Sequence, residues 1–161
     1  MLPNYQNILV ATDLTPNAVQ AFKHAVMMAR RNKANIHLLH VVPEVDPAMR
    51  SYIAAMMLKG SLEKFDSQHE EEARQLIRER LQKFAADELA DHPEDLQRVK
   101  TTEVLHGDPV ARILQTADRL EADVIVMGTH GKGQLEYTFL GSVAEKVLRK
   151  SRRPVFIVPL P

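Results

Sequence analysis

Five short apolar runs alternate along this chain with segments of helical periodicity. Most of the runs are rich in consecutive Val, Ile and Leu instead of alternating apolar and polar residues, which is typical of strands buried on both faces of a sheet. Alternating strands and helices predict a doubly wound α/β fold, with helices on both faces of one parallel sheet. We expect five strands in the common order 3-2-1-4-5. They are residues 8–11, 35–42, 99–105, 123–127 and 155–158.

Polar caps, prolines and apolar periodicity mark the helices. Thr15 fits the N-cap of the first helix and Pro16 its first position. Another short helix is expected over residues 142–150. The longest helix begins near Gln68 and ends before the break at residues 91–95. Its apolar stripe is Ala73, Leu76, Ile77, Leu81, Phe84 and Leu89.

Residues 44–66 do not follow the pattern. They carry Pro47, Gly60 and three methionines without one clear period, so we expect a mobile insertion with a helical turn or two. No internal repeat or low-complexity linker divides the rest of the chain. We therefore expect one domain over residues 1–161, a length that can bury a core.

Charge and composition exclude several classes of function. Lys and Arg together number 21, as do Asp and Glu, so no global field attracts nucleic acid or an anionic membrane. The chain has no cysteine, which excludes disulfides, thiolate metal sites and cysteine nucleophiles. The N-terminus does not resemble a signal peptide, and no apolar run reaches the ~20 residues of a membrane span. We expect a cytoplasmic protein that binds neither nucleic acid nor membrane.

A glycine-rich loop follows the fourth expected strand. Gly128 and Gly131 lack a side chain, so the backbone there can adopt positive φ and approach a ligand. Gly141 and Ser142 stand at the start of the last helix, where free N–H groups and the helix dipole favour a phosphate. In the expected strand order the loop faces Asp13 across the crevice between strands 1 and 4. Neither a Walker A loop nor a Rossmann fingerprint is present.

These residues resemble a known family. The spacing Gly128-x2-Gly131-x9-Gly141-Ser142 matches the G-2x-G-9x-G-S/T nucleotide-binding motif of the universal stress protein family. The resemblance extends nearly end to end. It includes an opening strand that ends in an aspartate (residues 7–13), a second strand (39–42), a Gly-Asp-Pro turn (107–109) and the closing strand (151–158).

The resemblance implies an adenine nucleotide alpha hydrolase-like fold that binds ATP, ADP or AMP. It also implies Mg or Mn held through the phosphates near Asp13, a variable insertion at residues 44–66, and a homodimer formed through residues 155–158. The implied nucleotide-binding residues are Ala11, Thr12 and Asp13 by the ribose and phosphates, Val41 at the adenine edge, Gly107 near the nucleoside, Met127 and Gly128 at the ribose, and Gly131, Gly141, Ser142 and Val143 at the phosphates.

The histidines offer further candidate contacts and metal ligands. His130 follows the fourth strand on the ligand side, so we add it to the candidate nucleotide contacts. His37 and His40 are three residues apart in a strand, point to opposite faces and cannot share a metal ion.

No base stands beside a nucleophile, so no catalytic residue is assigned. The chain is therefore expected to be a nucleotide-binding regulatory or stress-response module, with two alternatives: a weak Mg-dependent ATP hydrolase, or a non-catalytic dimeric interaction protein with an empty cleft.

Overall fold

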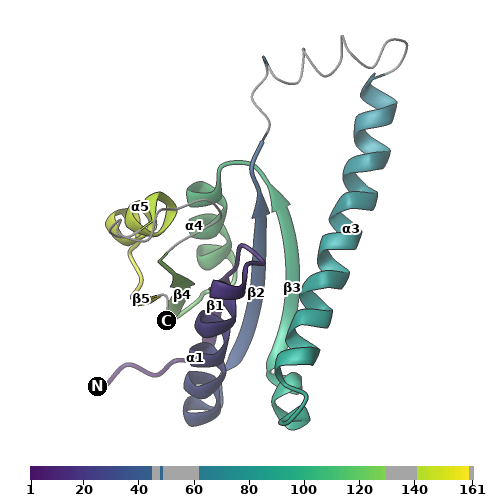
Figure 1. The fold of residues 1–161 in the computed structure, drawn as a ribbon. Coiled ribbons are helices and arrows are strands. Elements are labelled where there is room, and N and C mark those ends of the chain that lie inside the picture. The colour runs from purple at the N-terminus through teal and green to yellow at the C-terminus, as the bar shows by residue number, and fades with distance from the viewer. Residues whose placement is uncertain (45–47, 49–61, 130–140, 160–161) are drawn as a thin grey trace.

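The computed structural model describes residues 1–44, 48, 62–129 and 141–159, and strands alternate with helices through these segments (Figure 1). The strands are β1 (Asn7–Ala11), β2 (Asn35–Val42), β3 (Val99–His106), β4 (Val124–Gly128) and β5 (Val155–Val158). The α-helices are α1 (Pro16–Asn32), α3 (Leu62–Glu88), α4 (Pro109–Arg119) and α5 (Ser142–Lys150), and the short 3-10 helix η1 (Pro93–Arg98) precedes β3. None of the described helices is long and apolar enough to cross a membrane.

The described strands form one sheet in the order β3-β2-β1-β4-β5, and every neighbouring pair is parallel. Ile8 of the central strand β1 lies opposite Ile36 of β2 on one side and Val124 of β4 on the other. The predicted doubly wound α/β fold and its strand order are therefore confirmed. The order reverses between β1 and β4, which opens a crevice at their C-terminal ends.

Two apolar layers lie on opposite faces of this sheet, because successive strand side chains point in opposite directions. Ile8 and Val10 pack with α1 and the C-terminal half of α3. Leu9, between them, packs with α4 and α5 on the other face. The rings of Phe22 in α1 and Phe84 in α3 are 5.3 Å apart and join the two helices of the first layer. The helices thus cover both faces, as predicted.

Helix α3 differs from its prediction. It begins at Leu62 instead of near Gln68, so residues 62–66 belong to it, whereas most of the expected insertion lies outside the described residues. At ~1.5 Å per residue α3 is roughly 40 Å long, and β3 is about 26 Å. Figure 1 shows α3 running past the ends of β2 and β3. Leu81 in its stripe is fully buried, but Leu76 of the same stripe is 62% exposed.

His37 is a buried histidine of the α4/α5 layer. It lies 7% exposed in β2, with Nδ1 2.7 Å from the hydroxyl of Thr101 and Nε2 3.2 Å from Oδ1 of Asn7. Burial lowers the pKa of His37, and Arg119 adds to this effect while Glu103 opposes it. The folded protein therefore favours a neutral imidazole at His37.

Acidification should destabilise the protein through His37. Because its folded pKa is below the unfolded value of about 6.5, the unfolded chain takes up the proton first. We expect the free energy of unfolding to fall as the pH drops below about 6.5, until the lowered folded pKa is passed. Urea titrations between pH 7.5 and 4.5 measure this slope. The slope should be reduced in His37→Gln, and an equal slope in both proteins would contradict the assignment.

Candidate functional site

A cleft of about 370 Å³ opens at the C-terminal ends of β1 and β4. It collects nine of the twelve residues predicted from the sequence: Ala11, Thr12, Asp13, Val41, Met127, Gly128, Gly141, Ser142 and Val143. Sequence reasoning missed seven others: Ala18, Leu39, Pro43, Pro109, Ile113, Thr129 and Ala144. Most of these are apolar residues of a kind found throughout the core, and only the fold marks them as part of a site.

Three predicted residues are not in this lining. His130 and Gly131 lie outside the described residues. Gly107 follows β3 with φ +132°, and its N–H donates to the carbonyl of Val42 at 3.1 Å. A Cβ at Gly107 would lie 2.8 Å from Nε of Arg112, whose guanidinium donates to the carbonyl of His106. The glycine therefore leaves room for Arg112, and its contact with a ligand stays a prediction.

The two described glycines of the cleft, Gly128 and Gly141, do not have positive φ. Gly107 is the only glycine among the described residues with a positive φ, so Gly128 does not adopt the backbone conformation expected for it. Gly128 instead ends β4 and pairs with Val158, which keeps it extended. Gly141 has φ −54°, and its N–H donates to the carbonyl of Thr129 at 2.5 Å. This bond joins the two described residues that flank residues 130–140.

The N-terminus of α5 faces the cleft. Gly141 is its N-cap and offers no side-chain hydrogen bond, while Ser142 and Val143 of the first turn line the cleft. The first N–H groups of an α-helix have no intrahelical acceptor and carry the positive end of the dipole. Helix α4 is different, because Oδ2 of Asp108 accepts the N–H of Ala111 at 2.8 Å. Within the described residues, the end of α5 is thus free to bind an anion.

The turn after β1 presents Asp13. Its Oδ1 accepts hydrogen bonds from the N–H and the hydroxyl of Thr15, at 3.0 and 2.5 Å. Thr15 is the N-cap residue of α1, as predicted, but its hydroxyl goes to Asp13 and makes no capping bond to the helix. Within the described residues nothing donates to Oδ2 of Asp13. The cleft is therefore lined by a carboxylate held at one oxygen and free at the other.

Leu14 completes this turn in an unusual conformation. Its φ is +64°, a left-handed backbone that costs a residue with a side chain about 1–2 kcal/mol. Its N–H donates to the hydroxyl of Thr12 at 3.1 Å. Leu14 therefore has a strained backbone, which the surrounding hydrogen bonds must impose.

The strain at Leu14 should reverse the usual ranking of alanine and glycine. Both Leu14→Ala and Leu14→Gly remove the leucine contacts, but only glycine adopts positive φ without strain. We expect Leu14→Gly to be more stable than Leu14→Ala by about 1 kcal/mol in urea unfolding. The same pair at Gln20, inside α1, should rank in the opposite order. An alanine variant as stable as the glycine variant at position 14 would rule out the strain.

The described lining of the cleft combines an apolar wall with few polar groups. Leu39, Val41, Ile113 and Met127 supply much of the wall. Asp13 is the only charged side chain among the described lining residues. Such a cleft suits a ligand with a flat apolar part, hydroxyl groups near Asp13 and an anionic part at the start of α5.

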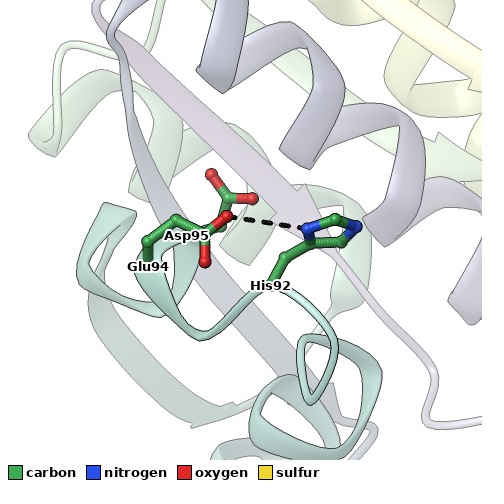
Figure 2. Close-up of side chains that lie close together, drawn as sticks. All are labelled: His92, Glu94 and Asp95. Carbon is green, nitrogen blue, oxygen red and sulfur yellow. Dashed lines mark ion pairs between the residues drawn. The ribbon is translucent and has the colours of Figure 1, made fainter.

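A second group of titratable side chains, His92, Glu94 and Asp95, lies around the start of η1 (Figure 2). His92 Nδ1 is 3.6 Å from a carboxylate oxygen of Glu94. Asp95 is 1% exposed, and both of its oxygens are occupied: Oδ2 accepts from Arg30 and Oδ1 accepts from Arg98. Two guanidinium groups on the buried carboxylate oppose a cation. The group therefore anchors η1 to α1 and is not a metal centre.

Hydrogen bonds from these arginines also determine the charge of Asp95. The bond from Arg30 lowers the pKa of Asp95 most, and Arg98 lowers it further against the opposing effect of burial. Asp95 is thus ionised over the neutral range. The sequence indicates a helix break at residues 91–95 and does not predict this network. Arg30 lies in a distant helix, and no local pattern marks its pair with Asp95.

The sequence is similar to those of known proteins. The sequence model described as the universal stress protein family matches residues 4–159. Universal stress protein MJ0531 of Methanocaldococcus jannaschii is 32% identical over 157 residues, which cover 98% of this chain and 84% of that protein. Universal stress protein MJ0577 of the same organism is 30% identical over 157 residues, with 96% and 94% covered.

Solved structures agree with these sequence matches. The structure of MJ0577 superimposes with a TM-score of 0.73 at 30% identity, covering 98% of this chain and 97% of that one. A universal stress protein solved in complex with cAMP has a TM-score of 0.54 at 20% identity, with 98% of each chain covered. The second likeness concerns the fold alone.

Proposed function

The chain belongs to the universal stress protein family, and on this basis we propose that it binds ATP or a related adenine nucleotide as a regulatory or stress-response module. One observation supports this most. Asp13 from the start of the chain and Gly128, Gly141 and Ser142 from its end line a single cleft, although only the fold brings them together. That the same fold accommodates cAMP in a distant relative agrees with the proposal.

The apolar part of the cleft would hold the adenine. Leu39, Val41 and Ile113 lie on the side of β2 and α4, and an aromatic base is a flat group that such side chains can enclose. Main-chain atoms at the end of β2 would meet the polar edge of the base. The ribose would then lie between Met127 and Asp13, with its hydroxyl groups donating to the free carboxylate oxygen.

The phosphates would lie at the start of α5. Ser142 offers a hydroxyl there, and the N–H groups of the first turn, which have no side-chain cap among the described residues, offer donors without a charged side chain. Holding a phosphate needs no more than this. The described lining contains no histidine, lysine or second carboxylate beside Asp13 that would activate water, so we favour nucleotide binding over hydrolysis.

A divalent cation would assist the binding of a triphosphate. Asp13 is negative and close to the proposed phosphates, and Mg²⁺ typically binds one or two carboxylates together with substrate phosphates. The free Oδ2 of Asp13 fits this role, and the Ser142 hydroxyl is a further oxygen ligand in the same cleft. The cation would neutralise phosphate charge, while the protein residues orient the base and the ribose.

Isothermal titration with Mg-ATP, ADP, AMP and Mg-GTP tests this function. We expect the adenine nucleotides to bind and Mg-GTP to bind more weakly. Gly141→Val should weaken Mg-ATP binding at least about tenfold, because Gly141 is buried where the phosphates would approach. Ala90→Val, on an exposed residue distant from the cleft lining, is the matched control. Normal Mg-ATP binding by Gly141→Val would overturn the placement of the phosphates.

We also propose one domain over residues 1–161, with residues 44–66 as a variable insertion, that pairs with a second copy through β5. In the described sheet β5 is an edge strand, bonded only to β4, and its Phe156 is 41% exposed. An apolar edge invites pairing with another strand. Sedimentation analysis should give a dimer, and Phe156→Asp should shift it towards monomer; a monomeric wild type would contradict this part of the proposal.

A further inference from the structure

The turn that carries Asp13 is attached to β2 at two main-chain atoms of Thr12. The N–H of Thr12 donates to the carbonyl of Leu39 at 2.9 Å. The carbonyl of Thr12 lies 2.8 Å from Nδ1 of His40. Leu39 and His40 are neighbours in β2, so these two hydrogen bonds hold both the N–H and the carbonyl of Thr12 against the same strand.

His40 reaches the turn from the face opposite the cleft. Leu39 lines the cleft and packs in the α4/α5 layer, so the side chain of the next residue points to the α1/α3 face. Accordingly His40 is not in the described cleft lining, whereas Thr12 is. The imidazole therefore holds the Thr12 carbonyl from behind the site and does not contact a ligand in it.

The turn depends on the hydrogen bond from His40 because the backbone conformation of Leu14 is intrinsically unfavourable. Leu14 has φ +64°, and apart from the main-chain bond between Thr12 and Leu39 the other hydrogen bonds of the turn, from Leu14 to Thr12 and from Thr15 to Asp13, are local. Among the described residues, His40 is the only side chain outside the turn that bonds to it. A strained conformation persists only where its surroundings impose it. Losing the bond would also leave the carbonyl of Thr12, an 8% exposed residue, without its partner.

We propose that His40 is a positioning residue of the nucleotide site, holding the Thr12 carbonyl so that the Asp13 carboxylate meets the ligand. This inference rests on the proposed function. A carbonyl only accepts, so Nδ1 must carry the proton. Both the neutral Nδ1–H form and the charged imidazolium can make the bond. The property that matters is therefore a donor at the position of Nδ1 and not the charge of the ring.

Side-chain geometry provides a matched set of variants. The amide nitrogen of asparagine is as many bonds from Cα as Nδ1 of histidine, so His40→Asn restores a donor near the same position. His40→Gln places its amide nitrogen one bond further out, and His40→Leu fills space without a donor. His37→Leu is the control, because His37 is a buried histidine of the same strand that bonds to Asn7 and Thr101 and not to the turn.

Titration calorimetry of these variants with Mg-ATP, together with urea unfolding, tests the proposal. We expect His40→Leu to bind about tenfold more weakly and His40→Asn within about threefold of wild type. The control His37→Leu should lose stability while keeping its affinity. Amide ¹H–¹⁵N shifts of residues 12–15 in the ligand-free protein should move in His40→Leu and recover in His40→Asn.

The outcomes separate this inference from the function it rests on. Wild-type affinity in His40→Leu would overturn the role of His40 and leave the nucleotide site intact. If His40→Leu does not fold, the Mg-ATP affinities of His40→Asn and His40→Gln are compared instead. Equal affinities in those two variants would overturn the positioning role of His40. A wild type that binds no adenine nucleotide would reject the proposed function, and the role of His40 with it.

Discussion

Asp13→Asn is expected to weaken the binding of adenine nucleotides about 10–100-fold, since a hydrogen bond to a charged group contributes roughly 1.5–3 kcal/mol. Asparagine keeps the size of the side chain and an oxygen that can still accept from Thr15. The turn should therefore survive while the free anionic oxygen is lost. Titration calorimetry with Mg-ATP and with adenosine measures the effect.

The two ligands distinguish what Asp13 contacts. If its carboxylate accepts from the ribose, adenosine and Mg-ATP lose affinity together; if it holds only a cation, the loss is confined to Mg-ATP. Asp108→Asn is the matched control, because Asp108 caps α4 and is outside the described cleft lining. It should change stability and not affinity. Unchanged binding of both ligands by Asp13→Asn would remove Asp13 from the site.

Asp95→Asn is expected to lower the free energy of unfolding by about 3 kcal/mol, near the lower end of the range for breaking a buried ion pair. The carboxylate is 1% exposed, whereas the side chains of Arg30 and Arg98 are about one-third exposed (35% and 29%), which limits the loss. The variant removes the charge that both guanidinium groups face. Asp87→Asn, in an exposed pair with Lys83, should cost at most about 0.5 kcal/mol.

The pH dependence of Asp95→Asn provides a second readout. The pKa of Asp95 is lowered in the folded protein, so its stabilisation is complete above the unfolded value of about 3.9 and is lost as the pH falls through the folded pKa. Urea unfolding at pH 7, 4 and 3 should thus bring wild type and variant closer together at the acidic end. A difference that stays constant with pH would show that the ion pairs are not its source.

The sheet was predictable chiefly because its inner strands β1, β2 and β4 are largely buried on both faces and therefore have a plain sequence signature. The continuous apolar runs placed β2 and β5 at their observed ends and the other strands within one residue. The start of α3 was not predictable in the same way. Its first turns extend past the ends of β2 and β3, and in the middle of the helix Leu76 of the predicted stripe is exposed, so apolar residues of this helix do not all report burial. Periodicity identifies a helix only where one face is covered.

The site was predictable as far as its residues follow strands or begin helices. Asp13 and the glycines Gly128 and Gly141 have such places, and the cleft contains all three. The partners that hold them were not predictable. His40 reaches Thr12 across 28 residues of sequence, and Arg30 reaches Asp95 across 65. Such contacts depend on how distant elements pack, which a local pattern does not encode.

Nucleotide binding is tested most directly on the purified, unmodified protein. The protein is denatured, the supernatant is chromatographed for adenine nucleotides, and the thermal unfolding of the native protein is followed with and without Mg-ATP. We expect an adenine nucleotide in the supernatant, or a rise in the unfolding midpoint with Mg-ATP of the kind that a ligand bound only to the folded state produces. If no adenine nucleotide is released and Mg-ATP does not shift the unfolding midpoint, the proposed function is contradicted.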